Sequence, residues 1–166
     1  MKTLRILGWV VLGLALLAGL AWLFRSDPIG PISGRALRGA EAAYPSDWAF
    51  SDEYTTIALE SRPDDPHSVT TICFVHDGAL YVPAEGGSTK RWTGYVVADP
   101  RVRLKIGDGV YPARAVRVEG VEPETFLGSA GKKYPQVAEA DGELPEDIWL
   151  FRIEPRAEAT GPSVSD

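Results

Sequence analysis

Two Asp-Gly pairs, Asp77-Gly78 and Asp108-Gly109, constrain the fold of this 166-residue chain more than any other feature. Asp-Gly supplies the positive φ that tight hairpin turns need, and each pair separates two runs rich in strand-forming residues. These runs are residues 68–75 and 79–84 around the first pair, and residues 101–106 and 110–119 around the second. The middle of the chain is therefore predicted to form two β-hairpins.

Further strands are predicted on either side of the two hairpins. Residues 54–60 and 147–154 are rich in Thr, Ile, Trp and Phe, and both runs end at prolines. Between the hairpins, Ser88 or Thr89 is expected to cap a short helix, which stops before Pro100 because a residue preceding proline avoids the helical region. The sequence thus predicts a mainly β fold, a six-stranded barrel with helices at its rim.

An uncharged run over residues 6–24 predicts one transmembrane helix, because 19 apolar residues nearly match a hydrocarbon core about 30 Å thick. The alternative is a signal peptide cleaved near Gly19-Leu20-Ala21, but the apolar Trp22-Leu23-Phe24 would then follow the cut. The Lys2/Arg5 pair favours an N-terminus inside the cell. We expect a single-pass protein, with the lipid bilayer as a partner and the globular domain outside the cytoplasm.

The chain divides into four predicted parts: the anchor at 1–25, a linker or arm at 26–53, the barrel at 54–156 and a disordered tail at 157–166. Within the arm, residues 35–43 are predicted to form a short helix. The large aromatic side chains of Trp48 and Phe50 are expected to pack onto the barrel.

Composition excludes several kinds of function. Residues 1–25 hold three of the 17 basic residues and no acidic one, which leaves 14 basic against 23 acidic residues in the rest of the chain. Nucleic acid is therefore not an expected partner. Two histidines, His67 and His76, interpreted as surface turn residues, do not predict a metal site. The single Cys73 lies in a predicted buried strand and is interpreted as a small apolar residue rather than a nucleophile.

The best candidate site is the hinge between the first hairpin and the helix. A Gly-rich turn before a helix offers N–H groups to an anion, and two basic residues add positive charge. The candidate residues are Gly86, Gly87, Ser88, Thr89, Lys90, Arg91 and Trp92, with Thr70 and Thr71 on the neighbouring strand. The competing interpretation is structural: the glycines make a turn, the basic residues are solvated and Trp92 anchors the helix to the core.

The hinge VPAEGGSTKRW, the following helix and the hairpin ADPRVRLKIGDGVYPARAVRV resemble the FMN-binding split-barrel superfamily. The resemblance extends over residues 54–154. Within the superfamily, this segment is similar to the deazaflavin-dependent nitroreductases and the pyridoxamine-phosphate-oxidase-like proteins. The resemblance implies FMN or a deazaflavin as cofactor, with its phosphate at the hinge, and a homodimer with the cofactor between subunits.

Two functions follow from the resemblance. The first is a membrane-anchored oxidoreductase that reduces a small substrate, for which no catalytic residue can be named. The alternative is a non-enzymatic, membrane-tethered barrel that has lost the cofactor and binds a small molecule or a protein.

Overall fold

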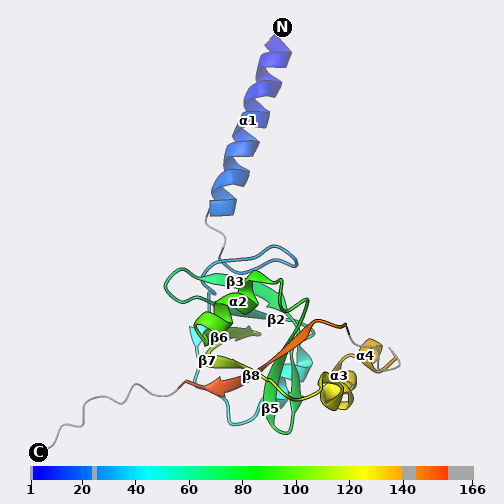
Figure 1. The fold of residues 1–166 in the computed structure, drawn as a ribbon. Helices are drawn as coiled ribbons and strands as arrows, with labels where there is room; N and C mark the ends of the chain where they lie inside the picture. Colours follow the sequence, from blue (N-terminus) through cyan, green and yellow to red (C-terminus); the bar gives the residue numbers. More distant parts are fainter. Residues whose placement is uncertain (1, 24–25, 140–144, 157–166) are drawn as a thin grey trace, which may run out of the picture.

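The computed structural model describes residues 2–23, 26–139 and 145–156, which form a mainly β domain with one long N-terminal helix (Figure 1). The strands are β1 (Ala40–Glu41), β2 (Ile57–Ser61), β3 (His67–Thr71), β4 (Phe74–His76), β5 (Ala79–Glu85), β6 (Arg101–Ile106), β7 (Gly109–Arg117) and β8 (Ile148–Pro155). The helical segments are α1 (Lys2–Leu23), η1 (Ala49–Glu53), α2 (Arg91–Ala98), η2 (Pro123–Phe126), α3 (Leu127–Lys133) and α4 (Pro135–Glu139).

The strands form one sheet with the order β3-β2-β6-β7-β8-β5-β4, and every neighbouring pair in this order is antiparallel. Its two end strands, β3 and β4, are consecutive in the chain and separated only by Ile72 and Cys73. Because β3 also contacts β5, the sheet curls until its ends meet. This topology is that of a partly closed barrel.

The predicted hairpins and helix are confirmed, but the number of strands is not six. Residues 68–75 divide into β3 and β4, because the chain leaves one side of the barrel for the other at Ile72-Cys73. The eighth strand, β1, is too short to be read from the sequence. Helix α2 begins at Arg91 with Lys90 as its N-cap, so neither Ser88 nor Thr89 caps it.

The barrel interior is apolar, and every second residue of β6 points into it. Val102, Leu104 and Ile106 are at most 2% exposed, and Cys73 is fully buried. Trp48 is also buried, stacks on Phe50 and meets the edge of Tyr111, which confirms that the aromatic segment packs onto the barrel.

The arm before the barrel is extended, which makes the predicted helix over residues 35–43 wrong. Glu60, only 4% exposed, accepts hydrogen bonds from the Leu37 amide at 2.6 Å and from Arg103 Nη2 at 2.6 Å. β1 then pairs in parallel with the start of β7. Tertiary hydrogen bonds thus outweigh a weak local preference for helix.

Helix α1 covers most of the predicted membrane span and stands clear of the barrel in Figure 1. Within the described residues, no helix combines the length and hydropathy that a membrane crossing requires. The side chains of Lys2 and Arg5, which carry the orientation argument, lie outside the described residues, as do those of residues 22–25. The predicted disordered tail at 157–166 lies outside them too.

Candidate functional site

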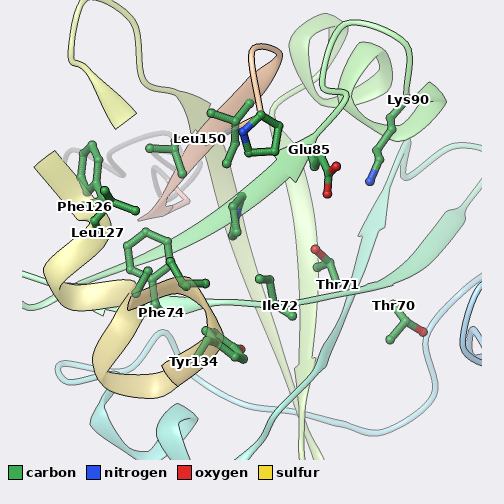
Figure 2. A pocket seen from close by; sticks show the side chains of 15 residues that line it. Thr70, Thr71, Ile72, Phe74, Glu85, Lys90, Phe126, Leu127, Tyr134 and Leu150 are labelled. Atoms are coloured by element: carbon green, nitrogen blue, oxygen red, sulfur yellow. The ribbon is translucent and has the colours of Figure 1, made fainter. Parts of the chain in front are cut away.

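A cavity of about 370 Å³ opens between the broken strand β3–β4, the end of β5, the start of β8 and the helices α3 and α4 (Figure 2). This volume lies within the range typical of small-molecule sites, about 300–1,000 Å³. The lining residues are Thr70, Thr71, Ile72, Phe74, Pro83, Glu85, Lys90, Phe126, Leu127, Ala130, Tyr134, Val137, Pro145, Ile148 and Leu150.

The cavity has an apolar end and a polar end. Figure 2 shows Phe74, Phe126 and Leu127 on one side, while Glu85, Lys90 and Thr71 lie together on the other with their polar atoms turned toward one another. Such a pocket suits a ligand with an apolar ring and a few polar groups at one edge.

The hinge between β5 and α2 is held closed by Asp147, just before β8. The carbonyl oxygen of Asp147 accepts from the amides of Gly86 at 2.6 Å and Gly87 at 3.2 Å. Its carboxylate Oδ2 accepts from the Ser88 amide at 2.9 Å and from Ser88 Oγ at 2.6 Å. The hydrogen bonds from Ser88 lower the pKa of Asp147, so this carboxylate is charged at neutral pH.

The remaining hinge amides also have partners inside the chain. Those of Thr89 and Lys90 donate to the Gly86 carbonyl at 3.0 and 3.2 Å. Gly86 has a φ of 63°, which lets the chain reverse here. Consequently, each N–H group from Gly86 to Lys90 is used by the fold, and the side chain of Lys90 is what the hinge presents to the cavity.

Of the nine residues predicted for the site, the structure brings three together at the cavity: Thr70, Thr71 and Lys90. The other six, Gly86, Gly87, Ser88, Thr89, Arg91 and Trp92, do not line it. Arg91 is exposed and donates to the Tyr95 hydroxyl at 3.0 Å. Trp92 is 6% exposed and packs on Phe151 in the barrel core, the position that the structural interpretation of the hinge predicts.

The cavity wall is fixed by Tyr134, which follows α3 and is 3% exposed. Its hydroxyl lies 2.8 Å from the Thr55 carbonyl oxygen and 3.0 Å from that of Cys73, which share its one proton. The hydroxyl oxygen accepts from the Cys73 amide at 3.3 Å. A side chain thus bonds the backbone groups that the strand break leaves without a ladder partner. Burial raises the pKa of Tyr134 to about 12, so the phenol keeps its proton.

Lys133, next to Tyr134, also connects the end of α3 to the barrel. Its ammonium donates to the Ser51 carbonyl at 2.7 Å and lies 3.4 Å from Cys73 Sγ. Burial raises the pKa of the Cys73 thiol, although Lys133 opposes this shift. The thiol is therefore neutral at physiological pH, as its interpretation as an apolar residue requires.

Three parts of the site were missed by sequence reasoning. Glu85 lies one residue beyond the predicted strand at 79–84, and β5 extends to include it, which brings it to the cavity. Asp147 is 59 residues from Ser88, and nothing in the sequence signals that they pair. The apolar wall comes from residues 126–137, which form the end of η2 and the short helices α3 and α4, and its placement over the strand break has no sequence signal.

The histidines differ from their interpretation as surface turn residues. His67 lies half-buried in β3, with its ring edge-on to Tyr95, and burial lowers its pKa. His76 ends β4, and its Nδ1 lies 2.8 Å from Ser129 Oγ. Among the described residues, no group of three or more His, Cys, Asp or Glu side chains is arranged to hold a metal ion.

The residues at the cavity fit one part of a flavin better than another. A ring system fits the apolar end, with Lys90 and Thr71 available to its carbonyl oxygens. A phosphate at the hinge does not fit, because the amides from Gly86 to Ser88 already bind Asp147. A second cavity, of about 380 Å³, is lined by Tyr44, Asp77, Gly78 and Arg152 among others and lies away from the hinge.

Comparison with known proteins identifies the fold. No protein-family model matches the sequence, and no curated protein matches it. Among solved structures, HutZ, the heme storage protein of Vibrio cholerae, has a TM-score of 0.51 at 18% identity, over 65% of this chain and 86% of that one. The conserved hypothetical protein Rv2991 of Mycobacterium tuberculosis has a TM-score of 0.50 at 20% identity, over 73% and 87%.

A third similar structure is Atu2129 of Agrobacterium tumefaciens, a protein of unknown function, with a TM-score of 0.50 at 20% identity. The match covers 62% of this chain but only 49% of that protein, so this chain spans about half of its length. These identities show a shared fold. The likeness supports the predicted mainly β barrel at the level of the fold alone.

Proposed function

We propose that this chain is a split-barrel oxidoreductase that binds the ring of a flavin or deazaflavin in the 370 Å³ cavity and reduces a small substrate. The observation that carries the proposal is the meeting of Thr70, Thr71 and Lys90, chosen from the sequence, with an apolar wall of ring-sized dimensions. The resemblance of residues 54–154 to the FMN-binding split barrels supports the same class of ligand.

The residues of the chain have distinct roles in this proposal. Phe74, Phe126 and Leu150 cover the ring and exclude water from it, while the Lys90 ammonium donates to a carbonyl oxygen at the polar edge of the ligand. Tyr134 and Lys133 hold α3 in place as the wall. When bound, the cofactor supplies the hydride chemistry, and no side chain of the cavity is assigned as a proton donor.

A second candidate function is the binding of a small molecule without redox chemistry. The engagement of the hinge by Asp147 favours it, because a barrel that had lost a phosphate-bearing cofactor would be free to use those amides internally. The two candidates share the cavity and differ in whether a bound ring is reduced and reoxidised there.

Two adjacent basic residues provide a matched test of ligand binding. Lys90 lines the cavity and Arg91 does not, so Lys90→Ala and Arg91→Ala remove the same charge from neighbouring positions. In titrations of the full-length chain in mild detergent with riboflavin, FMN and a deazaflavin, we expect Lys90→Ala to weaken binding about tenfold, or about 1.4 kcal/mol. Arg91→Ala should change it less than about twofold. Equal effects of the two variants, or no binding of any ring, would contradict the proposal.

A redox measurement separates the two candidates. The ring bound to the full-length chain is reduced chemically, and its reoxidation by an artificial electron acceptor is followed in a stopped-flow instrument. Acceleration of about tenfold or more over the free ring supports the oxidoreductase. Saturable binding without acceleration supports the non-enzymatic barrel instead.

A further inference from the structure

We infer that Asp147 at the hinge and Glu85 at the polar end of the cavity exclude phosphate, so that the site selects ring ligands without a phosphate over phosphorylated ones. This inference rests on the proposed function, because it narrows the class of ligand that the same cavity accepts. It departs from what the resemblance implies, which is a phosphate seated at the hinge.

The first step is that the hinge already holds a negatively charged group. Asp147 Oδ2 lies 2.9 Å from the Ser88 amide and 2.6 Å from Ser88 Oγ, the two donors that a phosphate oxygen would need there. The same residue takes the Gly86 and Gly87 amides with its carbonyl oxygen. A phosphate could bind only by displacing an anion that the chain itself carries, at high effective concentration.

The second step concerns the charges around the polar end. Glu85 lines the cavity beside Lys90, and within the described part of the chain neither side chain has a hydrogen-bonding or ionic partner. Both charges are therefore free to act on a ligand. Two further cations of this region are engaged elsewhere. Arg91 donates to the Tyr95 hydroxyl at 3.0 Å. The Arg117 guanidinium lies 3.5 Å from the centre of the Trp149 ring and pairs with Glu119 at 3.6 Å.

These charges discriminate between ligands by the number of negative charges they carry. At the polar end of the cavity the Lys90 ammonium lies beside the Glu85 carboxylate, and Asp147 holds a further negative charge on the hinge. A neutral ring gains the Lys90 hydrogen bond, whereas a phosphate dianion also meets the repulsion of Glu85 in the cavity, or of Asp147 at the hinge. Selection of this kind arises from an unfavourable contact with the wrong ligand.

Riboflavin and FMN differ only by the phosphate, and they are the probes for the first test. We expect the full-length wild-type chain to bind riboflavin at least as tightly as FMN. The double variant Asp147→Asn/Glu85→Gln should shift the ratio of the two dissociation constants toward FMN by about tenfold. Glu146→Gln removes the same charge from the exposed neighbour of Asp147 and should shift the ratio less than about twofold.

Glu85→Gln alone guards against a folding defect, because the Glu85 side chain has no bonding partner among residues 2–23, 26–139 and 145–156. It should move the ratio in the same direction. A wild-type chain that binds FMN about tenfold more tightly than riboflavin would overturn the inference, and so would a ratio that the double variant leaves unchanged.

A titration with inorganic phosphate tests the exclusion of phosphate without any ring ligand. In NMR spectra of the full-length chain, phosphate at concentrations up to about 10 mM should cause no saturable shift of the Ser88 amide in the wild type. A saturable shift there would overturn the inference. If neither riboflavin nor FMN binds, the proposed function fails, while this titration still tests the exclusion of phosphate at the hinge.

Discussion

At the break in the barrel strand, the Tyr134 hydroxyl bonds backbone groups of Thr55 and Cys73 that have no strand partner. Tyr134→Phe removes this partner from the buried backbone of Cys73 and from the exposed Thr55. It should lower the free energy of unfolding by about 1–3 kcal/mol, measured by chemical denaturation. Tyr95→Phe, which removes an exposed hydroxyl that accepts from Arg91, is the control and should cost less than about 0.5 kcal/mol. Equal losses in the two variants would contradict this role.

Because of the Tyr134 hydroxyl, we expect the free energy of unfolding to depend on pH. Tyr134 keeps its proton to about pH 12 in the folded chain, whereas the ordinary pKa of tyrosine is 10.0. The unfolded chain therefore loses this proton first, and the stability that Tyr134 contributes is complete below pH 10 and lost as the pH rises through 12. The difference in unfolding free energy between wild type and Tyr134→Phe should be smaller at about pH 11 than at about pH 9. The same difference in unfolding free energy at both pH values would contradict this prediction.

At the scale of elements, the hinge depends on close contact between Gly87 and Trp149 of β8. A Cβ on Gly87 would overlap the Trp149 ring, so Gly87→Ala must displace the hinge or β8 and should destabilise the chain by about 1–3 kcal/mol. Gly94→Ala is the matched control, because its Cβ would enter open space on α2. There the substitution should stabilise by up to about 1 kcal/mol. Thermal unfolding distinguishes the two, and stabilisation by Gly87→Ala would show that the contact does not hold.

The elements also show what a sequence can predict. β6 and its hairpin partner β7 were found nearly to the residue, because alternation and an Asp-Gly turn are local signals. The break at Ile72-Cys73 was missed, since its apolar residues read as one continuous strand. The course of the arm was missed too, because it is set by the partners of Glu60 and by β7, which lie far away in the sequence.

On the scale of the whole molecule, three of nine predicted site residues meet at the cavity, and the reason is topological. Thr70, Thr71 and Lys90 lie where the broken strand passes the end of β5, a meeting that the hairpin order implies. Asp147 and the α3–α4 wall arrive from later in the chain, and their contacts depend on tertiary packing. The homodimer implied by the resemblance stays a prediction.

Membrane attachment also stays a prediction from residues 6–24, and it concerns the whole chain. We expect the full-length chain to remain with membranes after carbonate washing, whereas deletion of residues 2–23 should release it into the soluble fraction. Trp9 and Leu17, 72% and 64% exposed on α1, are the kind of surface that lipid would cover. Release of the full-length chain by carbonate would contradict the anchor.

The most direct test of the central claim is to map where a ring binds. Riboflavin is titrated into the isotopically labelled full-length chain, and the backbone amide shifts are followed. The account predicts saturable shifts at Thr71, Lys90, Ala130 and Leu150, which surround the 370 Å³ cavity. Shifts confined to Asp77, Gly78 and Arg152 at the second cavity, or no saturable shifts at all, would contradict it.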